Sequence, residues 1–384
     1  MNTPPKYTVL VVQRRLTHYR APFFEALRVE LASRGCSLRL AYGSGTRAEL
    51  VKNDADELPW AIQLPTRYYF QEQLCWQPFS VALTGVDLVV VTQENKLIYN
   101  LVSQFLHKRY RVGLWGHGAN LQGDPNSWRE RFKRLVSKRA DWWFAYTDWS
   151  LPFIERIGFP IERTTVLNNA IDTTTLTMQR NSVRPAALQK LKHDLDLQGA
   201  CIGIYVGSLY TEKRIDFMLE SAARIHNCLP EFEFLIVGAG PQQALVEEFC
   251  LKNSWAKYLG ICKGPAKVEA MALAQVMLNP GAVGLSVLDS FVCSVPVVTT
   301  SCSTHGPEIS YLRNGENGLV SPNSVDEYVA STVGLLKNQV VLAKLKAGCE
   351  LSAKEYTVEN MARHFADGVI QCLSKPMYRR AGAT

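Results

Sequence analysis

The sequence predicts an α/β protein made of two facing Rossmann-like domains with a cleft between them. Continuous apolar runs of strand length alternate with amphipathic helical stretches, which is typical of parallel sheets covered by helices on both faces. This alternation runs through the first half of the chain, stops in a polar stretch near 175–198, and starts again at about residue 201. Ligands bind outside the carboxyl ends of such strands, so two facing units would form a cleft.

Length and composition allow two domains of ordinary size. The chain has 384 residues, of which 47% are hydrophobic and 20% charged, as in globular proteins with full cores. No apolar run approaches the ~18–20 residues of a transmembrane helix, and the N-terminus leads directly into a strand, so we expect a cytoplasmic protein without a signal peptide. The 10 cysteines have no metal-ligand spacing, and we expect free thiols, no metal and no cofactor.

The first half contains the elements of one domain. Its apolar runs have strand length, and its helical stretches carry apolar residues on one face. The connection from 43 to about 85 is polar and rich in Trp and Tyr. We expect strands at 8–12, 37–42, 87–92, 112–116, 142–146 and 165–167, and helices at 20–35, 96–107, 128–139 and 148–157.

The second half repeats the pattern. We expect strands at 201–207, 233–237, 258–259, 274–278 and 297–299, and helices at 216–227, 241–252, 263–273 and 326–337. The predicted organisation is a first domain at 1–175, a linker with a lead-in helix at 176–198, a second domain at 199–355, and C-terminal helices at 356–384 that pack back on the first domain.

The net charge of +7 lies in the first half of the chain, and the second half is balanced. The helix expected at 128–139 concentrates basic residues around an apolar core, which is the pattern of a peripheral helix on an anionic membrane. A solvated basic face is the alternative. No nucleic-acid-binding motif accompanies the charge, so we expect no nucleic-acid partner.

The segment 279–291 carries the clearest chemical signal. An apolar strand, a Pro/Gly loop and a helix follow one another, which places free N–H groups and the positive helix end at one point. This is an anion site suited to a phosphate. Asp289 falls about one turn into the helix, where it can reach a ribose hydroxyl. An ordinary strand–loop–helix with a buried aspartate is the alternative.

This segment resembles the signature of the group 1 (family 4) retaining glycosyltransferases. Pro280, the Gly284-Leu285 pair, Asp289 and the Pro-Val-Val run at 296–298 match it. Gly281 stands where the family usually has an acid that touches the donor sugar. A second resemblance, to the family's Gly-Arg-Leu…Glu-Lys-Gly element, follows the strand at 201–207. It rests on Gly207, Leu209, Glu212 and Lys213.

Two positions of the second element depart from the family. Ser208 replaces an arginine and Arg214 replaces a glycine, so one phosphate cation is missing unless Arg214 or the loop amides compensate. The Gly-Ala-Gly-Pro run that starts at Gly238 resembles the family's turn after the second strand of the donor domain. As a dinucleotide fingerprint this run is weak. His117 follows a strand of the first half, and the resemblance implies that it faces the donor sugar.

The loop after the first strand is basic. Arg14, Arg15, His18 and Arg20 lie there, and the segment resembles a family branch with a His-Tyr-Arg-x-Pro-Phe-Phe entry. We expect these four residues to hold a phosphate of the acceptor, and surface arginines around a helix start are the alternative.

The resemblance implies a GT-B glycosyltransferase. The first domain would bind the acceptor. The second domain would bind the donor, a nucleotide diphosphate sugar in which the nucleotide is UDP. Transfer to a sugar or lipid-linked hydroxyl would retain the anomeric configuration, in polysaccharide or glycolipid assembly at the inner face of the plasma membrane. His117 and Lys213 would be catalytic. The implied donor-binding residues are Gly207, Ser208, Lys213, Arg214, Gly238, Gly281, Gly284, Leu285, Ser286 and Asp289. A nucleotide-sugar epimerase and a non-catalytic nucleotide-sugar-binding protein are the alternatives.

Overall fold

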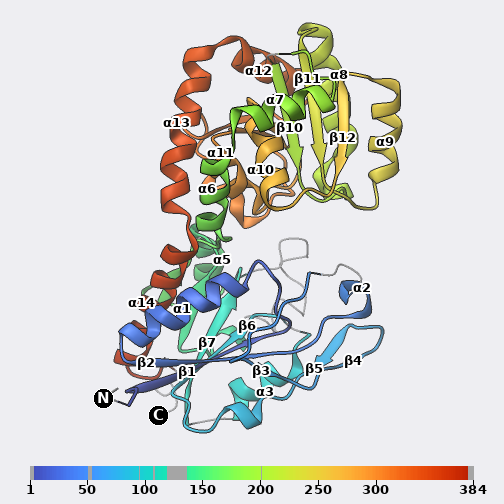
Figure 1. Cartoon of the computed structure of the whole chain (residues 1–384). Coiled ribbons are helices and arrows are strands. Elements are labelled where there is room, and N and C mark those ends of the chain that lie inside the picture. The colour runs from blue at the N-terminus through green and yellow to red at the C-terminus, as the bar shows by residue number, and fades with distance from the viewer. Residues whose placement is uncertain are drawn as a thin grey trace. The chain divides into compact units, whose positions relative to one another are not determined.

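The chain divides into two compact units, each built on one parallel sheet (Figure 1). The structure, a computed structural model, describes residues 4–50, 54–94, 96–106, 109–118, 136–199 and 201–378. Unit 1 consists of Met1–Ile171 with Val358–Thr384, and unit 2 of Asp172–Thr357. Two Rossmann-like α/β domains were predicted, and they are present. Their arrangement across a cleft stays a prediction.

Unit 1 has a seven-stranded sheet in the order β3-β2-β1-β6-β7-β8-β9, in which all strand pairs are parallel. The central strands are apolar and buried along their length because helices cover the sheet. The strands are β1 (Tyr7–Gln13), β2 (Cys36–Tyr42), β3 (Ile62–Gln63), β6 (Leu88–Thr92), β7 (Arg111–Gly116), β8 (Trp142–Ala145) and β9 (Thr164–Val166).

The long polar connection in the first half contains structure of its own. A short helix, an antiparallel hairpin and a 3₁₀ turn lie between β2 and β6. They are α2 (Arg47–Leu50), β4 (Arg67–Tyr69), β5 (Leu74–Trp76) and η1 (Ser80–Ala82). The other elements of unit 1 before residue 171 are α1 (Ala21–Ser33), α3 (Ile98–Leu106), η2 (Asp148–Ser150), α5 (Leu151–Arg156) and η3 (Ile161–Arg163).

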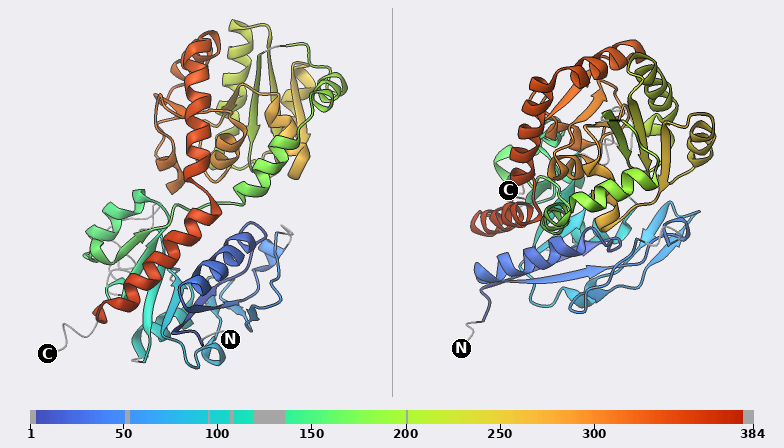
Figure 2. Two further views of the ribbon diagram at one scale, coloured as in Figure 1. Left: turned by 60° about the vertical axis from the view of Figure 1, so that its left-hand side comes forward. Right: turned by 45° about the horizontal axis from the view of Figure 1, so that its top comes forward.

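The last helix of the chain, α14 (Val358–Ser374), belongs to unit 1. It lies beside α1 in both figures and packs on β8 and β9 (Figures 1 and 2). Phe365 stacks on Phe144 with ring centroids 4.3 Å apart. Gly368 permits this approach, since a Cβ there would lie 2.6 Å from the Thr165 hydroxyl oxygen. The helix therefore completes the core of the first unit.

Unit 2 has a six-stranded parallel sheet in the order β12-β11-β10-β13-β14-β15. Five strands agree with the predicted runs, and the edge strand β15 was not predicted from the sequence. The strands are β10 (Cys201–Val206), β11 (Phe232–Val237), β12 (Ala256–Gly260), β13 (Val276–Leu278), β14 (Val297–Thr300) and β15 (Gly318–Ser321).

The segment 176–198 was expected to be a linker with a lead-in helix, and most of it lies in two helices of unit 2. These are α6 (Thr173–Ser182) and α7 (Pro185–Asp194), and they pack on α10 (Gly264–Ala272). Helices α12 and α13, coloured orange to red in Figure 2, pack on the β14–β15 side of the sheet. The other elements are η4 (Thr211–Lys213), α8 (Ile215–Cys228), α9 (Gln243–Lys252), α11 (Ser286–Cys293), η5 (Pro307–Tyr311), α12 (Val325–Lys337) and α13 (Gln339–Glu355).

Each sheet has one point where the strand order reverses. In unit 1 it lies between β1 and β6, and in unit 2 between β10 and β13. In open α/β sheets, ligands bind outside the carboxyl ends of the strands at such a point. The carboxyl edges of the two sheets are therefore where functional residues are expected.

Candidate functional site

The residues predicted to bind the donor lie at the carboxyl edge of unit 2. Gly207, Ser208 and Lys213 follow β10, Gly238 follows β11, and the segment 281–289 follows β13. β10 pairs with both β11 and β13 in parallel, so the three strand ends lie side by side. The fold thus brings the two predicted motifs together at the reversal of strand order.

The loops after β10 and β11 are joined backbone to backbone. The Leu209 N–H donates to the Ala239 carbonyl at 2.9 Å. A Cβ on Gly238 would lie 1.8 Å from the Gly207 carbonyl oxygen, and one on Gly240 would lie 2.4 Å from the Leu209 carbonyl oxygen. Gly238 also has a φ of 145°, which is accessible only to glycine at little cost. This packing explains the Gly-x-Gly run without a dinucleotide.

Lys213 is buried at this edge, with 6% of its surface exposed. Its Nζ donates to the Ala282 carbonyl oxygen in the loop after β13. A Cβ on Gly284 would lie 3.8 Å from the same Nζ atom. Burial lowers the pKa of its ammonium group from 10.5 to about 8, against the opposing effect of the Glu308 charge. The side chain therefore directs a cation at the loop that carries Gly284.

A glycine is required at position 281 because the backbone around Lys213 packs closely against it. A Cβ at this position would lie 2.5 Å from the Glu212 carbonyl oxygen and 2.5 Å from the Lys213 carbonyl carbon and oxygen. The Ala282 N–H also donates to the Glu212 carbonyl at 2.8 Å. The missing acid at residue 281 is thus explained by the close approach of two backbone segments, and any donor contact there would be made by main-chain atoms.

Arg214 ties the loops of this edge together. It has a left-handed φ of 56°, a conformation that glycine adopts most easily, as in the family motif that this segment resembles. Its guanidinium donates to the Asn323 side-chain oxygen at 2.5 Å and to the Thr300 hydroxyl at 3.2 Å. Ser208 is exposed. These partners are neutral oxygens, and the role of Arg214 as a replacement for the family's arginine at position 208 stays a prediction.

The Gly284-Leu285 pair leads directly into α11, whose first residue is Ser286. The first N–H groups of a helix lack carbonyl partners within it, so this end attracts an anion. The Ser286 hydroxyl is buried there and has no hydrogen-bond partner among the described residues. The side-chain oxygens of Asn279 and Thr299 are buried at this edge in the same condition. Such atoms are commonly satisfied by a ligand or by water.

Asp289 lies in α11 and is 6% exposed. Its carboxylate forms an ion pair with Lys267 of α10 at 2.6 Å. A carboxylate accepts several hydrogen bonds, so the pair leaves capacity for a hydroxyl ligand. Sequence reasoning missed Lys267, because only the packing of α10 on α11 brings the two residues together.

His305, which sequence reasoning did not assign to the site, holds the loop after β14 against the loop after β13. The Val283 N–H donates to His305 Nδ1 at 3.2 Å, and His305 Nε2 lies 2.7 Å from the Thr300 carbonyl oxygen. Both contacts are satisfied by a neutral ring with its proton on Nε2. Burial raises the pKa of the neighbouring Cys302 thiol, but hydrogen bonds from His305, Thr304 and Thr300 outweigh this and lower it to about 6.

At the carboxyl edge of unit 1, His117 follows β7 and stacks on Tyr146, which follows β8. Their ring centroids are 4.2 Å apart. The catalytic role of His117 stays a prediction.

The expected acceptor residues differ in their surroundings. Arg14 forms two hydrogen bonds of 2.6 Å with Glu49, and Arg15 bonds Asp54 at 2.6 and 3.0 Å. The hydrogen bonds from these arginines hold the pKa values of both carboxyl groups below their usual range. An acceptor phosphate at Arg14 or Arg15 would have to compete with these carboxylates.

His18 and Arg20 lie in the same loop. His18 is exposed, and its Nδ1 lies 3.3 Å from the Asp54 carbonyl oxygen. Arg20, in contrast, is buried with 7% of its surface exposed. Of the four expected acceptor residues, Arg20 alone is a buried cation without a carboxylate recorded beside it in the described part of the chain.

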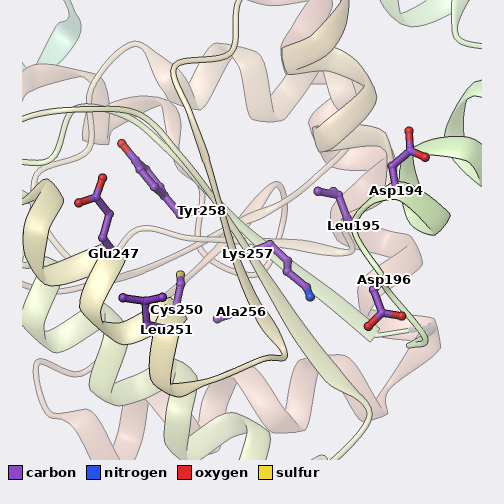
Figure 3. A pocket seen from close by; sticks show the side chains of 9 residues that line it. All are labelled: Asp194, Leu195, Asp196, Glu247, Cys250, Leu251, Ala256, Lys257 and Tyr258. Atoms are coloured by element: carbon purple, nitrogen blue, oxygen red, sulfur yellow. The ribbon is translucent and has the colours of Figure 1, made fainter.

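A groove of about 610 Å³ lies elsewhere in unit 2, along the start of the edge strand β12 (Figure 3). Asp194, Asp196, Glu247 and Lys257 supply its charged side chains. None of the predicted donor residues lines it, and its position before the strand ends differs from that of the carboxyl-edge site.

The predicted basic helix at 128–139 lies almost wholly outside the described residues, so its membrane role stays a prediction. Among the residues that the structure describes, no helix is long and apolar enough to span a bilayer. The same residues contain no group of three or more His, Cys, Asp and Glu side chains placed to hold a metal ion.

Comparison with known proteins gives matches for unit 2 and for the fold. Residues 200–338 match the family model described as glycosyl transferases group 1. The alpha-monoglucosyldiacylglycerol synthase of Acholeplasma laidlawii is 24% identical over 191 residues, 48% of this chain and 47% of that relative. The 2-deoxystreptamine glucosyltransferase of Streptomyces kanamyceticus is 28% identical over 198 residues, 48% of this chain and 49% of that relative. The chain thus spans about half the length of the curated relatives it matches.

The crystal structure of Anabaena HepE in complex with UDP aligns with 94% of this chain and 99% of its own, with a TM-score of 0.69 and 15% identity. This likeness establishes the fold. The chain has the GT-B fold of two Rossmann-like domains, as the sequence predicted, and the group 1 match lies within its second unit.

Proposed function

We propose that the protein is a glycosyltransferase that moves a sugar from a UDP-linked donor to an acceptor hydroxyl with retention of anomeric configuration. The observation that carries the proposal is the buried Lys213 at the strand-order reversal of unit 2, directed at the loop that leads into α11. The group 1 match supports it, because residues 200–338 contain this whole edge.

The donor would lie along the carboxyl edge of unit 2. Its diphosphate would be held by Lys213 and by the N–H groups of Gly284, Leu285 and Ser286, since a cation and a helix N-terminus both stabilise negative charge. The ribose hydroxyls would hydrogen-bond to Asp289. Backbone atoms of Gly207, Ser208, Gly238 and Gly281 would border the nucleotide, and Arg214 would fix the loops around it.

The chemistry would depend on charge stabilisation and positioning. As the bond between the sugar and the diphosphate breaks, negative charge develops on the leaving phosphate, and Lys213 would stabilise it. The sugar would pass through an oxocarbenium-like state, with His117 facing it. His117→Ala should therefore lower transfer more than UDP affinity.

The acceptor would bind unit 1. The Acholeplasma laidlawii relative is named as an alpha-monoglucosyldiacylglycerol synthase, which supports a lipid acceptor in glycolipid assembly. A role in polysaccharide assembly and attachment to the inner membrane face through 128–139 remain parts of the proposal that rest on the sequence. The names of both relatives refer to a glucosyl group, which supports UDP-glucose as the first donor to test.

A screen of nucleotide sugars by thermal shift, followed by a UDP-release assay with the best ligand, tests the proposal. We expect UDP and one UDP-sugar to raise the melting temperature, and UDP release to accelerate when an acceptor is added. The anomeric configuration of the product, read by NMR, tests retention. Conversion of the sugar without an acceptor would indicate an epimerase, and stabilisation without release or transfer would indicate a binding protein.

A further inference from the structure

Arg20, at the carboxyl edge of unit 1, is a buried cation that lacks a charged partner in the described part of the chain. Its guanidinium lies over the rings of Trp115 and Tyr19, with Cζ 5.1 and 5.2 Å from their centroids, and 5.7 Å from that of Tyr146. Its recorded hydrogen bond is a weak one, from Nη1 to the Met361 sulfur at 3.9 Å.

Three other arginines of unit 1 are closely paired with carboxylates. Arg14, Arg15 and Arg34 each have a carboxylate oxygen within 2.6 Å. An uncompensated buried charge is costly, and the faces of aromatic rings compensate only part of that cost. The recorded contacts of Arg20 therefore leave its guanidinium able to bind an anion.

A second buried donor lies beside this cation. Trp115 is 1% exposed, and its indole N–H has no hydrogen-bond partner among the described residues. Thr92, which pairs with Trp115 across β6 and β7, has a buried hydroxyl in the same condition. Buried donors of this kind are rare in folded proteins and call for a ligand or water.

The position of this cluster fits a ligand. Arg20 directly precedes α1, whose first N–H groups lack helical partners and favour negative charge. Tyr146 also stacks on His117, so aromatic faces continue from the cation to the residue expected to face the transferred sugar. A sugar ring lying on these faces would carry its charged group to Arg20.

We infer that the acceptor carries an oxyanion, a phosphate or a carboxylate, and that Arg20 with the Trp115 indole N–H binds it. This inference rests on the proposed function, since it names the chemical class of the acceptor. It moves the acceptor contact away from Arg14 and Arg15, whose charges are already paired.

The test follows the indole N–H resonances of the 8 tryptophans by NMR, with Trp115→Phe used to assign Trp115. Inorganic phosphate and acetate are titrated separately into the full chain, with saturating UDP present to occupy the donor site. We expect a saturable shift of the Trp115 resonance with at least one anion and none with chloride at equal ionic strength. The anion that binds more tightly identifies the acceptor group.

Arg20→Met keeps the length of the side chain and removes its charge. We expect roughly 10- to 100-fold weaker anion binding, the scale of losing a charge-assisted hydrogen bond. Arg28→Met is the matched control, because Arg28 lies on α1 over the Trp60 ring but is paired with Glu25. It should leave the anion affinity unchanged.

Equal anion affinity in wild type and Arg20→Met would show that Arg20 only clamps α1 to α14, and would overturn the inference. If Arg20→Met does not fold, the wild-type titration decides, since a Trp115 resonance that neither anion shifts excludes the site. UDP affinity is measured on the same samples. Failure of UDP to bind contradicts the proposed function and not this inference. In that case the titration is repeated with Lys213→Ala, which removes phosphate binding at the donor site of unit 2 without the need for UDP.

Discussion

The carboxyl edges of the two units lie on the same kind of parallel sheet but are built from different parts of the chain. In unit 2 the edge is mainly backbone, because Gly238, Gly240 and Gly281 let neighbouring loops approach within 1.8 to 2.5 Å of where a Cβ would be. In unit 1 the edge is mainly side chain, with paired arginines, stacked rings and the buried Arg20.

This difference fits different tasks. An edge of backbone has a shape that few substitutions can alter, and it suits a ligand group that does not vary, such as a nucleotide diphosphate. An edge of side chains can change one residue at a time, which suits a partner that differs between related enzymes. The following experiments test whether unit 2 holds the constant ligand.

Removal of the buried cation should have the largest effect. Lys213→Ala should lower kcat by about 10²–10³-fold, because one preorganised group that stabilises developing charge is lost. Steady-state kinetics with the identified donor measures this. Lys257→Ala is the control, since Lys257 lines the groove along β12 instead. Activity within a few-fold of wild type would remove Lys213 from the mechanism.

Asp289→Ala should weaken binding of UDP and of the whole donor alike by about 1.5–3 kcal/mol, the range for hydrogen bonds to a charged group. Calorimetric titration measures both affinities. Lys267→Met separates the two roles of this carboxylate, because it removes the 2.6 Å ion pair and leaves Asp289 in place. It should cost less than Asp289→Ala. An unchanged UDP affinity in Asp289→Ala would contradict the ribose contact.

Gly281→Ala should lower the free energy of unfolding by about 1–3 kcal/mol, because its Cβ would overlap the backbone of Glu212 and Lys213. Gly281→Glu should be at least as unstable and should not raise activity. Urea unfolding compares both with Gly284→Ala, where the nearest atom is 3.8 Å from the added Cβ. Several-fold activation of a stable Gly281→Glu variant would show that a sugar-binding acid is merely missing.

The last prediction concerns the graded effect of pH on the charge of Lys213. Because the pKa of Lys213 is about 8 in the free folded protein, its protonated form is lost above that value, and kcat/KM for the donor, which reports the free enzyme, should fall by about tenfold per pH unit. Stability should respond in the opposite direction. Between about 8 and 10.5 the unfolded chain binds the extra proton, so the contribution of this group to stability rises with pH. A kcat/KM that stays flat from pH 8 to 9.5 would contradict a role for the charged form of Lys213.

The features that the sequence predicted well are local. Strands such as β6 and β11 are continuous apolar runs, and the Gly-rich loops follow them directly. β15 was missed because it is short, with only two apolar residues between Gly318 and Ser321. A helix was expected within 176–198, but its bounds were not, because α7 has no fully buried residue and its apolar face gives a weak pattern.

The side-chain partners were beyond sequence reasoning because they depend on distant contacts. Glu49 lies 35 residues from Arg14, and Asp289 lies 22 residues from Lys267. The sequence shows that Gly281 lacks an acid, but only the fold shows that another backbone segment occupies the space. Charge in the first half was visible from composition, whereas its neutralisation at Arg14 and Arg15 was not.

The final helix has a consequence for synthesis of the protein. Ribosomes deliver the N-terminus first, and domains commonly fold in that order as they emerge. Here the rings of Phe23 and Trp115 pack against Phe365 of α14. This helix is made only after all of unit 2 has been translated, so the contact cannot form earlier. The second unit has its complete sequence available before the first. A nascent chain therefore exposes the apolar surface that α14 will cover until α14 itself has been made, and a premature stop before α14 would remove part of the core of unit 1.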